Sequence, residues 1–194
     1  GYIGKRILPV LIKEGHTVVC CVRDKNRFKP PKSLLSKLEI IEVDLLKEHT
    51  LNNIPLGIDG AYYLVHSMSN SKDYEELEST SAKNFREYLK ETKIKHLVYL
   101  SGIINNKQLS KHLQSRKNVE KELSKGNYHF TTLRAGIIIG SGSASFEIIR
   151  DLVEKLPIMI TPKWLKTKCQ PTFPIYQNHP SAASRNAPGA VFPS

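Results

Sequence analysis

Residues 1–24 read GYIGKRILPVLIKEGHTVVCCVRD and show a turn, a helix and a strand in succession. Gly1 and Gly4 stand directly before an amphipathic stretch over residues 5–14, and an uninterrupted apolar run follows over residues 17–22. A glycine turn that leads into a helix and then into a buried strand is typical of an α/β sheet, where the turn connects a preceding strand to the helix. We therefore expect the first strand of the domain to lie before Gly1.

The same alternation continues along the chain. Short β-branched runs, which are typical of buried parallel strands, alternate with amphipathic stretches. The predicted strands cover residues 17–22, 39–43, 61–65, 97–101 and 131–139. The predicted helices cover residues 5–14 and 73–92, a stretch from Ser110 to Gly126, and one from Ser143 to Pro157. In the helix over residues 73–92, Leu77, Phe85, Tyr88 and Leu89 are expected to share the buried face. The predicted fold class is α/β: a Rossmann-like, doubly wound, mostly parallel sheet with helices on both faces and its first strand missing.

The domain organisation follows from length and composition. A chain of 194 residues with 40% hydrophobic side chains is sufficient for one sizeable core. We predict a dinucleotide-binding, Rossmann-like domain over residues 1–171. Residues 172–194 are rich in proline, with Arg185 as their only charged side chain, and lack apolar periodicity. We expect them to form an irregular, loose tail that is either native or the product of a disrupted reading frame.

Cysteine usage and hydropathy indicate the setting of the protein. The chain has three cysteines without CxxC spacing, and the neighbours Cys20 and Cys21 would point to opposite faces of a strand. Neither a disulfide framework nor a metal site is predicted. No apolar run approaches the roughly 18 residues that a membrane-spanning helix needs, and no signal peptide opens the sequence. These features predict a protein of the cytoplasm without a membrane partner.

The formal net charge of +11 raises the question of a nucleic-acid partner. The lysines are spread along the predicted helices and alternate with glutamates, which is the pattern of a solvated helix surface. We therefore expect the partner to be a small molecule or a protein, and nucleic acid is the least favoured of the three.

The residues at the predicted strand ends suggest a nucleotide. Gly1 and Gly4 would let the backbone approach a pyrophosphate at a helix N-terminus, although a glycine turn without a ligand is the simpler alternative. In such a unit the residue at the end of the next strand contacts the ribose of the adenosine. An acidic residue there holds the 2′-hydroxyl of NAD, and an arginine accommodates the 2′-phosphate of NADP. Here that strand ends in Arg23-Asp24 within a basic loop, which favours NADP unless Asp24 faces the ribose.

The following strand ends in Val43-Asp44-Leu45. The carboxylate of Asp44 would lie where the amino group of an adenine is met. A capping role for Asp44 is an equal alternative.

These segments together resemble the NmrA-like, atypical branch of the short-chain dehydrogenase/reductase superfamily, over residues 1 to about 171. The resemblance is carried by Gly1-Tyr2-Ile3-Gly4-Lys5-Arg6, Val22-Arg23-Asp24, Val43-Asp44-Leu45, Tyr62-Tyr63-Leu64-Val65-His66-Ser67, Leu100-Ser101-Gly102 and Leu133-Arg134-Ala135-Gly136. It implies NAD(P) across the strand ends, the glycine turn under the pyrophosphate, and His66 and Ser67 near the nicotinamide. The implied cofactor contacts are Gly1, Tyr2, Ile3, Gly4, Arg23, Asp44, Leu45, His66 and Ser67.

The catalytic residues of the superfamily are only partly present. Its usual reductases use a serine with a Tyr-x-x-x-Lys pair, in which the lysine lowers the tyrosine pKa. Ser101 matches the serine, but His112 and Arg116 stand where the tyrosine and lysine are expected. The candidate catalytic residues are therefore Ser101, His112 and Arg116, with a solvent-facing His112 as the plain alternative. The function predicted is an NADP(H)-binding, or else NAD(H)-binding, oxidoreductase of unknown substrate. The rival prediction is a non-catalytic dinucleotide-binding module that senses redox state or regulates a protein partner.

Overall fold

The computed structural model describes residues 1–66, 73–103, 111–136, 138, 140, 143–155 and 190–193. Helices and strands alternate along the chain, as the sequence predicts. In chain order they are α1 (Tyr2–Lys13), β1 (Val18–Val22), the 3₁₀ helices η1 (Lys25–Arg27) and η2 (Lys32–Lys37), β2 (Leu38–Glu42), α2 (Glu48–Leu51), β3 (Gly60–Tyr63), α3 (Tyr74–Leu89), β4 (His96–Gly102), α4 (Lys111–Leu123), β5 (His129–Ala135), α5 (Ala144–Lys155) and β6 (Ala190–Pro193).

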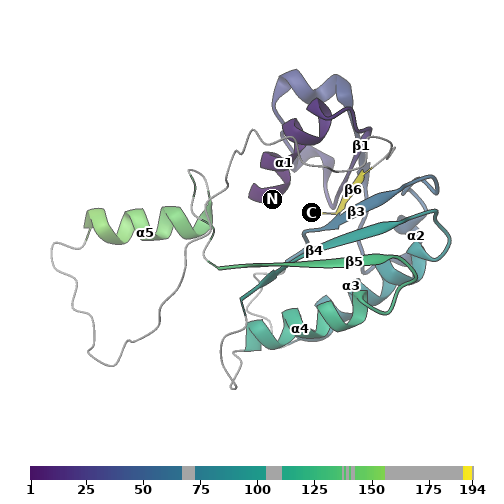
Figure 1. The fold of residues 1–194 in the computed structure, drawn as a ribbon. Helices are drawn as coiled ribbons and strands as arrows, with labels where there is room; N and C mark the ends of the chain where they lie inside the picture. The colour runs from purple at the N-terminus through teal and green to yellow at the C-terminus, as the bar shows by residue number, and fades with distance from the viewer. Residues whose placement is uncertain are drawn as a thin grey trace.

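The strands form one sheet in the order β2-β1-β6-β3-β4-β5. Every neighbouring pair is parallel. From the centre, β1 and β2 extend to one side and β3, β4 and β5 to the other, so the sheet is doubly wound (Figure 1). The predicted Rossmann-like fold class is therefore confirmed.

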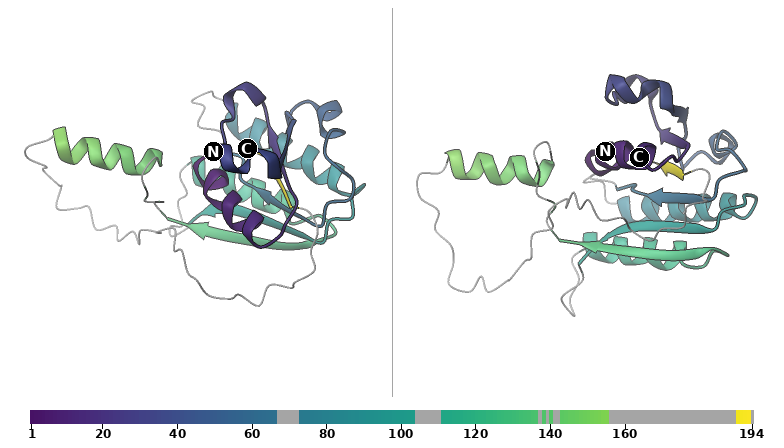
Figure 2. Two further views of the ribbon diagram at one scale, coloured as in Figure 1. Left: turned by 90° about the horizontal axis from the view of Figure 1, so that it is seen from above. Right: turned by 45° about the horizontal axis from the view of Figure 1, so that its top comes forward.

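Helices cover both faces of the sheet and create two cores. Figures 1 and 2 show α1 on one face and α3 with α4 on the other. Successive residues of a strand point to opposite faces, and β1 follows this rule: Val18 and Cys20 pack with α1, whereas Val19 and Cys21 pack on the side of α3 and α4. The predicted opposite orientation of the two cysteines is confirmed. Burial raises the pKa of the Cys20 thiol to about 11 and that of Cys21 further still.

Strand β6 corrects the prediction for the end of the chain. Residues 172–194 were expected to contain no regular element, yet Ala190–Pro193 form a strand between β1 and β3. Residues Ala190 to Pro193 pair with Val18 to Cys21 of β1, and Ala190 and Val191 also pair with β3. The composition of the segment could not reveal this, because pairing depends on two facing strand edges that form only in the folded sheet. The rest of residues 172–194 lies outside the described residues.

Strand β6 occupies the centre of the sheet, between β1 and β3. Pro193 lies at the last paired position of β6, where the absence of an amide N–H is tolerated. Both termini lie near one another on the side from which α5 extends (Figure 1). The described sheet thus holds a parallel strand at its centre, between β1 and β3.

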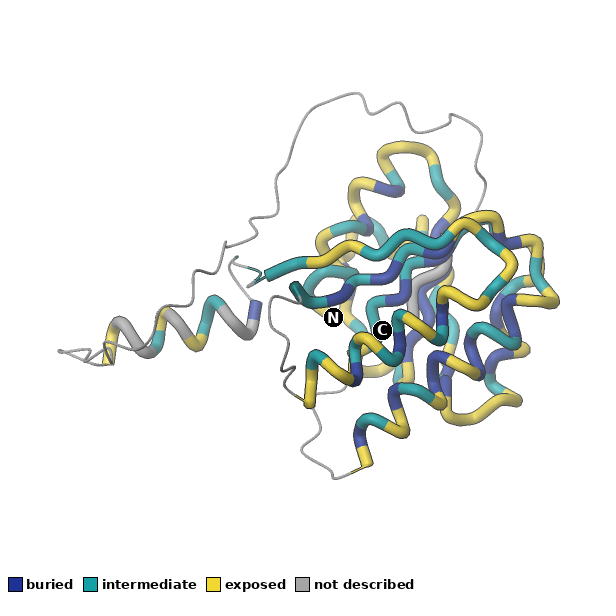
Figure 3. The backbone as a smooth tube through the Cα atoms, turned by 60° about the horizontal axis from the view of Figure 1, so that its bottom comes forward, coloured by how far each residue is buried: buried dark blue, intermediate teal, exposed yellow. Residues whose placement is uncertain are grey.

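Helix α3 corrects one predicted core residue. Phe85, Tyr88 and Leu89 are buried as predicted, but Leu77 is 41% exposed and its neighbour Glu78 is only 7% exposed. One residue corresponds to a rotation of about 100° around a helix, so the two side chains lie on different faces. Figure 3 shows buried positions recurring along one side of the helices that cover the sheet. The buried face of α3 therefore contains a carboxylate.

Candidate functional site

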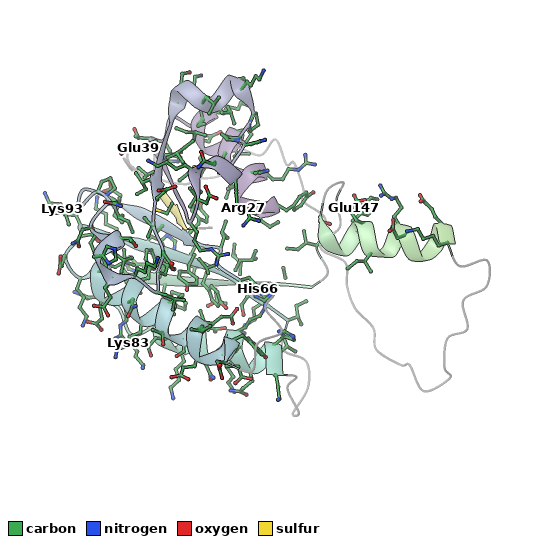
Figure 4. The ribbon with its side chains drawn as sticks, turned by 180° about the vertical axis from the view of Figure 1, so that it is seen from behind. Arg27, Glu39, His66, Lys83, Lys93 and Glu147 are labelled. Atoms are coloured by element: carbon green, nitrogen blue, oxygen red, sulfur yellow. The ribbon has the colours of Figure 1, made fainter. Side chains whose placement is uncertain are left out.

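Three of the predicted site residues, Arg23, Asp44 and His66, follow strands that end at one edge of the sheet. Because all six strands are parallel, their carboxyl ends meet at the same edge, and ligands of such sheets bind outside it. Arg23 is the first residue after β1, Asp44 is the second residue after β2, and His66 is the third residue after β3. Figure 4 shows Arg27, in the loop after β1, and His66 on the half of the molecule from which α5 extends.

The N-terminus of α1 offers unsatisfied backbone donors at this edge. Gly1 is the N-cap of α1, and no side chain caps the helix. The first turn contains no acidic residue. The first N–H groups of a helix have no partner within it and carry the positive end of the helix dipole, which together attract an anion. Tyr2 and Ile3 are part of this first turn.

The two glycines of the turn are not required by the packing of the chain itself. A Cβ atom added to Gly1 would meet nothing within 4 Å, and one added to Gly4 would meet only Leu64 Cδ1, at 3.8 Å. Gly15 is the only described glycine with a positive φ, so backbone conformation does not demand glycine at position 4 either. The open space above the turn fits the close approach of a pyrophosphate, and the contact with Leu64 brings the turn next to the end of β3.

Tyr2 shows a further polar feature of the turn. The guanidinium carbon of Arg6 lies 5.3 Å from the centre of the Tyr2 ring, within the range of a cation–π contact. The phenolic oxygen of Tyr2 is buried and has no hydrogen-bond partner among the described residues. A buried polar atom in this state is uncommon in a folded protein.

Arg23 and Asp24, at the start of the loop after β1, differ in their contacts. Asp24 Oδ1 accepts a hydrogen bond of 2.8 Å from the backbone N–H of Asn26 and so caps η1. Arg23 is exposed and forms no ion pair within the described part of the chain. Glu42, at the end of β2, accepts a hydrogen bond of 2.9 Å from the backbone N–H of Lys25 and fixes this loop against the sheet. The arginine is left available for a ligand, whereas Asp24 is engaged with the backbone.

Asp44 and Leu45 are engaged in the turn after β2. Asp44 Oδ1 accepts the backbone N–H of Leu46 at 3.1 Å, and Thr50 Oγ1 bonds both the N–H and the carbonyl oxygen of Asp44, each at 2.9 Å. Leu45 is 6% exposed and packs in the core, while its carbonyl oxygen accepts a bond from Asn84 Nδ2 at 2.9 Å. Asp44 thus caps its own turn through Oδ1, and the side chain of Leu45 lies in the core.

His66 meets a buried carboxylate after the end of β3. His66 Nδ1 lies 3.3 Å from Glu78 Oε1 of α3, and the His66 side chain remains 32% exposed. Glu78 Oε2 accepts a hydrogen bond from the hydroxyl of Ser115, a fully buried residue of α4. The imidazole therefore contacts a fixed carboxylate while the His66 side chain stays partly exposed. Ser67 lies outside the described residues.

Ser101 is deeply buried within β4. Its side chain is 1% exposed and faces the core on the side of α3 and α4, like Tyr99 two residues earlier. Ser101 Oγ has no partner in hydrogen-bond geometry among the described residues, but it lies near the Tyr99 phenol and favours ionisation of that phenol. Burial dominates and raises the pKa of Tyr99 to about 12. In this arrangement the hydroxyl of Ser101 is covered by the core beside Tyr99.

The other two predicted catalytic residues, His112 and Arg116, both lie on α4 but have different contacts. His112 is exposed and stacks on the ring of Tyr74 at the start of α3, with ring centres 5.0 Å apart. Arg116 is half-buried, and its carbonyl oxygen accepts a bond of 3.3 Å from the Tyr99 hydroxyl. His112 thus faces α3, and Arg116 lies beside Tyr99 and Ser101.

Sequence reasoning missed Glu78 and Ser115. A signal for Glu78 is present in the sequence, because it lies three, four and seven residues before Ser81, Ala82 and Phe85, all of which are buried. Because Leu77 was assigned to the buried face of α3, Glu78 was expected on its solvent-exposed side. Ser115 carries no comparable signal, since its partner lies 37 residues earlier in the chain.

Two searches of the described residues were negative. No helix there has both the length and the apolar character needed to cross a membrane. No group of three or more His, Cys, Asp or Glu side chains in that part of the chain is arranged to hold a metal ion.

Comparisons with known proteins agree with the geometry. The family model described as NAD(P)H-binding matches residues 1–154. The chain is 24% identical over 169 residues to the chloroplastic divinyl chlorophyllide a 8-vinyl-reductase of Arabidopsis thaliana, covering 78% of this chain and 40% of the plant protein.

Solved structures share the fold at low sequence identity. The structure of Pen from Bacillus thuringiensis superposes with a TM-score of 0.70 at 18% identity, covering 89% of this chain and 58% of Pen. The triphenylmethane reductase of Citrobacter sp., complexed with NADP(H), superposes with a TM-score of 0.56 at 16% identity, covering 70% of this chain and 46% of the reductase. The chain therefore spans between 40% and 58% of the length of these three relatives. The family match confirms the resemblance that the glycine turn and the strand ends predict: this chain belongs to the NAD(P)H-binding family.

Proposed function

We propose that this chain is the NADP(H)-binding part of an oxidoreductase, with the nicotinamide directed toward His66. The observation that carries the proposal is the N-terminus of α1, which is uncapped and holds two glycines that the fold itself does not require. It lies at the same sheet edge as Arg23 and next to the end of β3.

The preference for NADP rests on the loop after β1. Arg23 is exposed and unpaired within the described residues, while the carboxylate of Asp24 is bonded to the backbone of Asn26. Lys25 and Arg27 are also exposed in this loop. An arginine with free donors suits a phosphate dianion, and a carboxylate that already caps a turn is less able to hold a ribose hydroxyl.

NADPH, when bound, supplies a hydride to an electron-poor carbon of a small-molecule substrate such as a carbonyl compound or a quinone. The residues of the chain would bind and orient it. The N–H groups of the first turn of α1 would stabilise the pyrophosphate, and Arg23 would bind the 2′-phosphate. His66 would lie at the reacting end. Cys20 and Cys21 of β1 are buried thiols that form no disulfide, which agrees with a reducing, cytoplasmic setting.

A second function is favoured by the burial of Ser101. A serine that is 1% exposed, together with a His112 stacked on Tyr74, leaves the usual catalytic hydroxyls of the superfamily without an equivalent at the edge. The chain would then bind the dinucleotide and regulate a protein partner without turnover. Binding of NADPH without consumption across a broad panel of carbonyl and quinone substrates would favour this second function.

The first experiment is a titration with NADPH and with NADH, followed by thermal unfolding. A ligand that binds only the folded state raises the melting temperature. A charge-assisted bond contributes about 1.5–3 kcal/mol, so Arg23→Ala should weaken NADPH binding roughly tenfold to a hundredfold. Binding of NADH should change little.

Lys13→Ala is the matched control for the Arg23 variant. It removes one positive charge from an exposed residue at the far end of α1, so it reports any effect of net charge alone. Equal loss of NADPH binding in both variants would contradict a specific contact at Arg23. A melting temperature that neither dinucleotide raises would contradict the proposed function for this chain.

A further inference from the structure

We propose that Glu78 is a positioning residue for His66, and that His66 Nε2 exchanges the proton that accompanies hydride transfer. The inference rests on the proposed function and assigns the proton chemistry to residues outside the serine and Tyr-x-x-x-Lys set. The geometry that carries it is a chain of three contacting side chains from three different elements: Ser115 of α4, Glu78 of α3 and His66 after β3.

Each oxygen of Glu78 has a different partner. Oε2 accepts the hydrogen bond from the Ser115 hydroxyl, and Oε1 lies 3.3 Å from His66 Nδ1. Ser115 is fully buried and Glu78 is 7% exposed, so the packing of α3 against α4 fixes the carboxylate. A carboxylate held in this way accepts the N–H of Nδ1 and thereby selects the tautomer with a free Nε2.

The surroundings explain why the imidazole is the natural partner of the carboxylate. The buried phenols of Tyr63 and Tyr99 lie close enough to Glu78 to sense its charge. Burial is the larger cause of their raised pKa values, and both phenols are neutral near physiological pH. A buried carboxylate is costly without a compensating charge or hydrogen bonds. The Ser115 hydroxyl supplies a hydrogen bond, and His66 supplies a group that can carry the positive charge.

Several other titratable groups lie on the same two helices, and the Tyr74 phenol among them senses the charge of Glu78. Tyr74 and Glu75 lie at the start of α3, and His112 and Arg116 lie on α4. Tyr74 stacks on His112, which occupies the tyrosine position of the family pattern. His66 differs from all of these, because one ring nitrogen faces the buried carboxylate while the side chain stays 32% exposed at the ligand edge.

The proton step balances without a further reactant. NADPH would supply the hydride to a carbonyl carbon, and the electron pair of the C=O bond would move to the oxygen. That oxygen would take the proton from Nε2 of the His66 imidazolium, which would become a neutral imidazole and be protonated again from water. The products would be an alcohol and the oxidised dinucleotide. Glu78 stabilises the imidazolium throughout and does not itself transfer a proton.

The first test needs neither turnover nor cofactor. Long-range ¹H–¹⁵N NMR of the free chain distinguishes the two neutral tautomers of His66. We expect Nδ1 to carry the proton in the parent chain, and we expect Glu78→Gln, which loses the charge with little change of shape, to shift the population toward the Nε2–H tautomer. Glu76→Gln is the matched control, since it makes the same change at an exposed position of the same helix. An unchanged tautomer in Glu78→Gln would overturn the positioning role.

The second test addresses the ligand and the rate. Addition of NADPH should move the His66 side-chain signals, and Glu78→Gln should lower kcat for carbonyl reduction about tenfold to a hundredfold while the KM for NADPH changes less than twofold. His66→Ala should lower kcat at least as much, and added imidazole should restore part of the rate.

The outcomes separate this inference from the proposed function. If NADPH raises the melting temperature but leaves the His66 signals and the Glu78→Gln rate unchanged, dinucleotide binding stands and the proton role is overturned. If NADPH does not bind, the proposed function fails together with the proton role, and the tautomer measurement still decides whether Glu78 positions His66. Should Glu78→Gln fail to fold, Ser115→Ala releases Oε2 alone, and the inference then requires a smaller change of tautomer in the same direction.

Discussion

Replacing Val191 with proline removes an amide N–H from the central strand of the sheet. Val191 pairs with Val19 of β1 and with Ala61 of β3, so β6 joins the two halves of the sheet at this residue. Proline cannot donate to the ladder and occurs almost only on edge strands. Losing a hydrogen bond of about 1 kcal/mol and leaving a buried acceptor without its donor, at about 1–3 kcal/mol, predicts a loss of roughly 3 kcal/mol.

Urea unfolding followed by circular dichroism measures this loss. The total stability of a domain is about 5–15 kcal/mol, so 3 kcal/mol is a large fraction. With a urea dependence of about 2 kcal/mol per M, the midpoint should fall by about 1.5 M. Val191→Ile is the matched control, because it keeps the N–H and a β-branched side chain, and its midpoint should stay close to that of the parent. A Val191→Pro midpoint within about 0.3 M of the parent would refute the central placement of β6 in the cooperative unit.

Two further predictions concern the core under α4. Burial raises the pKa of Tyr99 to about 12, above the value of about 10 in an unfolded chain, so its contribution to stability is full below about pH 10 and is lost as the pH rises through 12. Urea titrations at about pH 8 and pH 11 should show roughly 1 kcal/mol lost from this residue, and Tyr99→Phe should show a smaller decrease than the parent. Gly102→Val should destabilise the chain by about 1–3 kcal/mol, because a Cβ at this position would lie 3.1 Å from Leu113 Cδ2 and 3.6 Å from Arg116 Cδ. Thermal unfolding measures this loss of stability. An unchanged melting temperature would contradict the prediction, because it would show that α4 can shift away from the new side chain without loss of stability.

The sequence by itself determined the fold class and most of its elements, because these depend on local patterns. Hydrophobic periodicity and glycine position separate strands from helices within a few residues of their observed ends: the strand predicted over residues 17–22 is β1 (Val18–Val22), and the helix predicted after Ser143 is α5 (Ala144–Lys155). The last predicted strand, over residues 131–139, corresponds to β5 (His129–Ala135), and residues 137 and 139 of that prediction lie outside the described residues.

The candidate site was predictable only in part. The glycine turn and Arg23 follow from motif and position, since a parallel sheet brings the ends of its strands to one edge. Position along the chain does not by itself give the contacts of Asp44 and Ser101. Asp44 caps its own turn, and Ser101 points to the covered face of β4. Which face a strand-end residue adopts depends on the register of the whole sheet, and a shift of one residue reverses it.

Only the tertiary structure decided two features. Strand β6 comes from a segment without a strand pattern, because its partners are the facing edges of β1 and β3, which exist only once the rest of the sheet has formed. The contact between Glu78 and His66 likewise requires α3 to lie across the end of β3 with α4 beside it. Local sequence patterns determine which residues are helical, extended or amphipathic. Which distant side chains meet depends on how those elements pack. The contact between the Glu78 carboxylate and the His66 imidazole is a result of that packing.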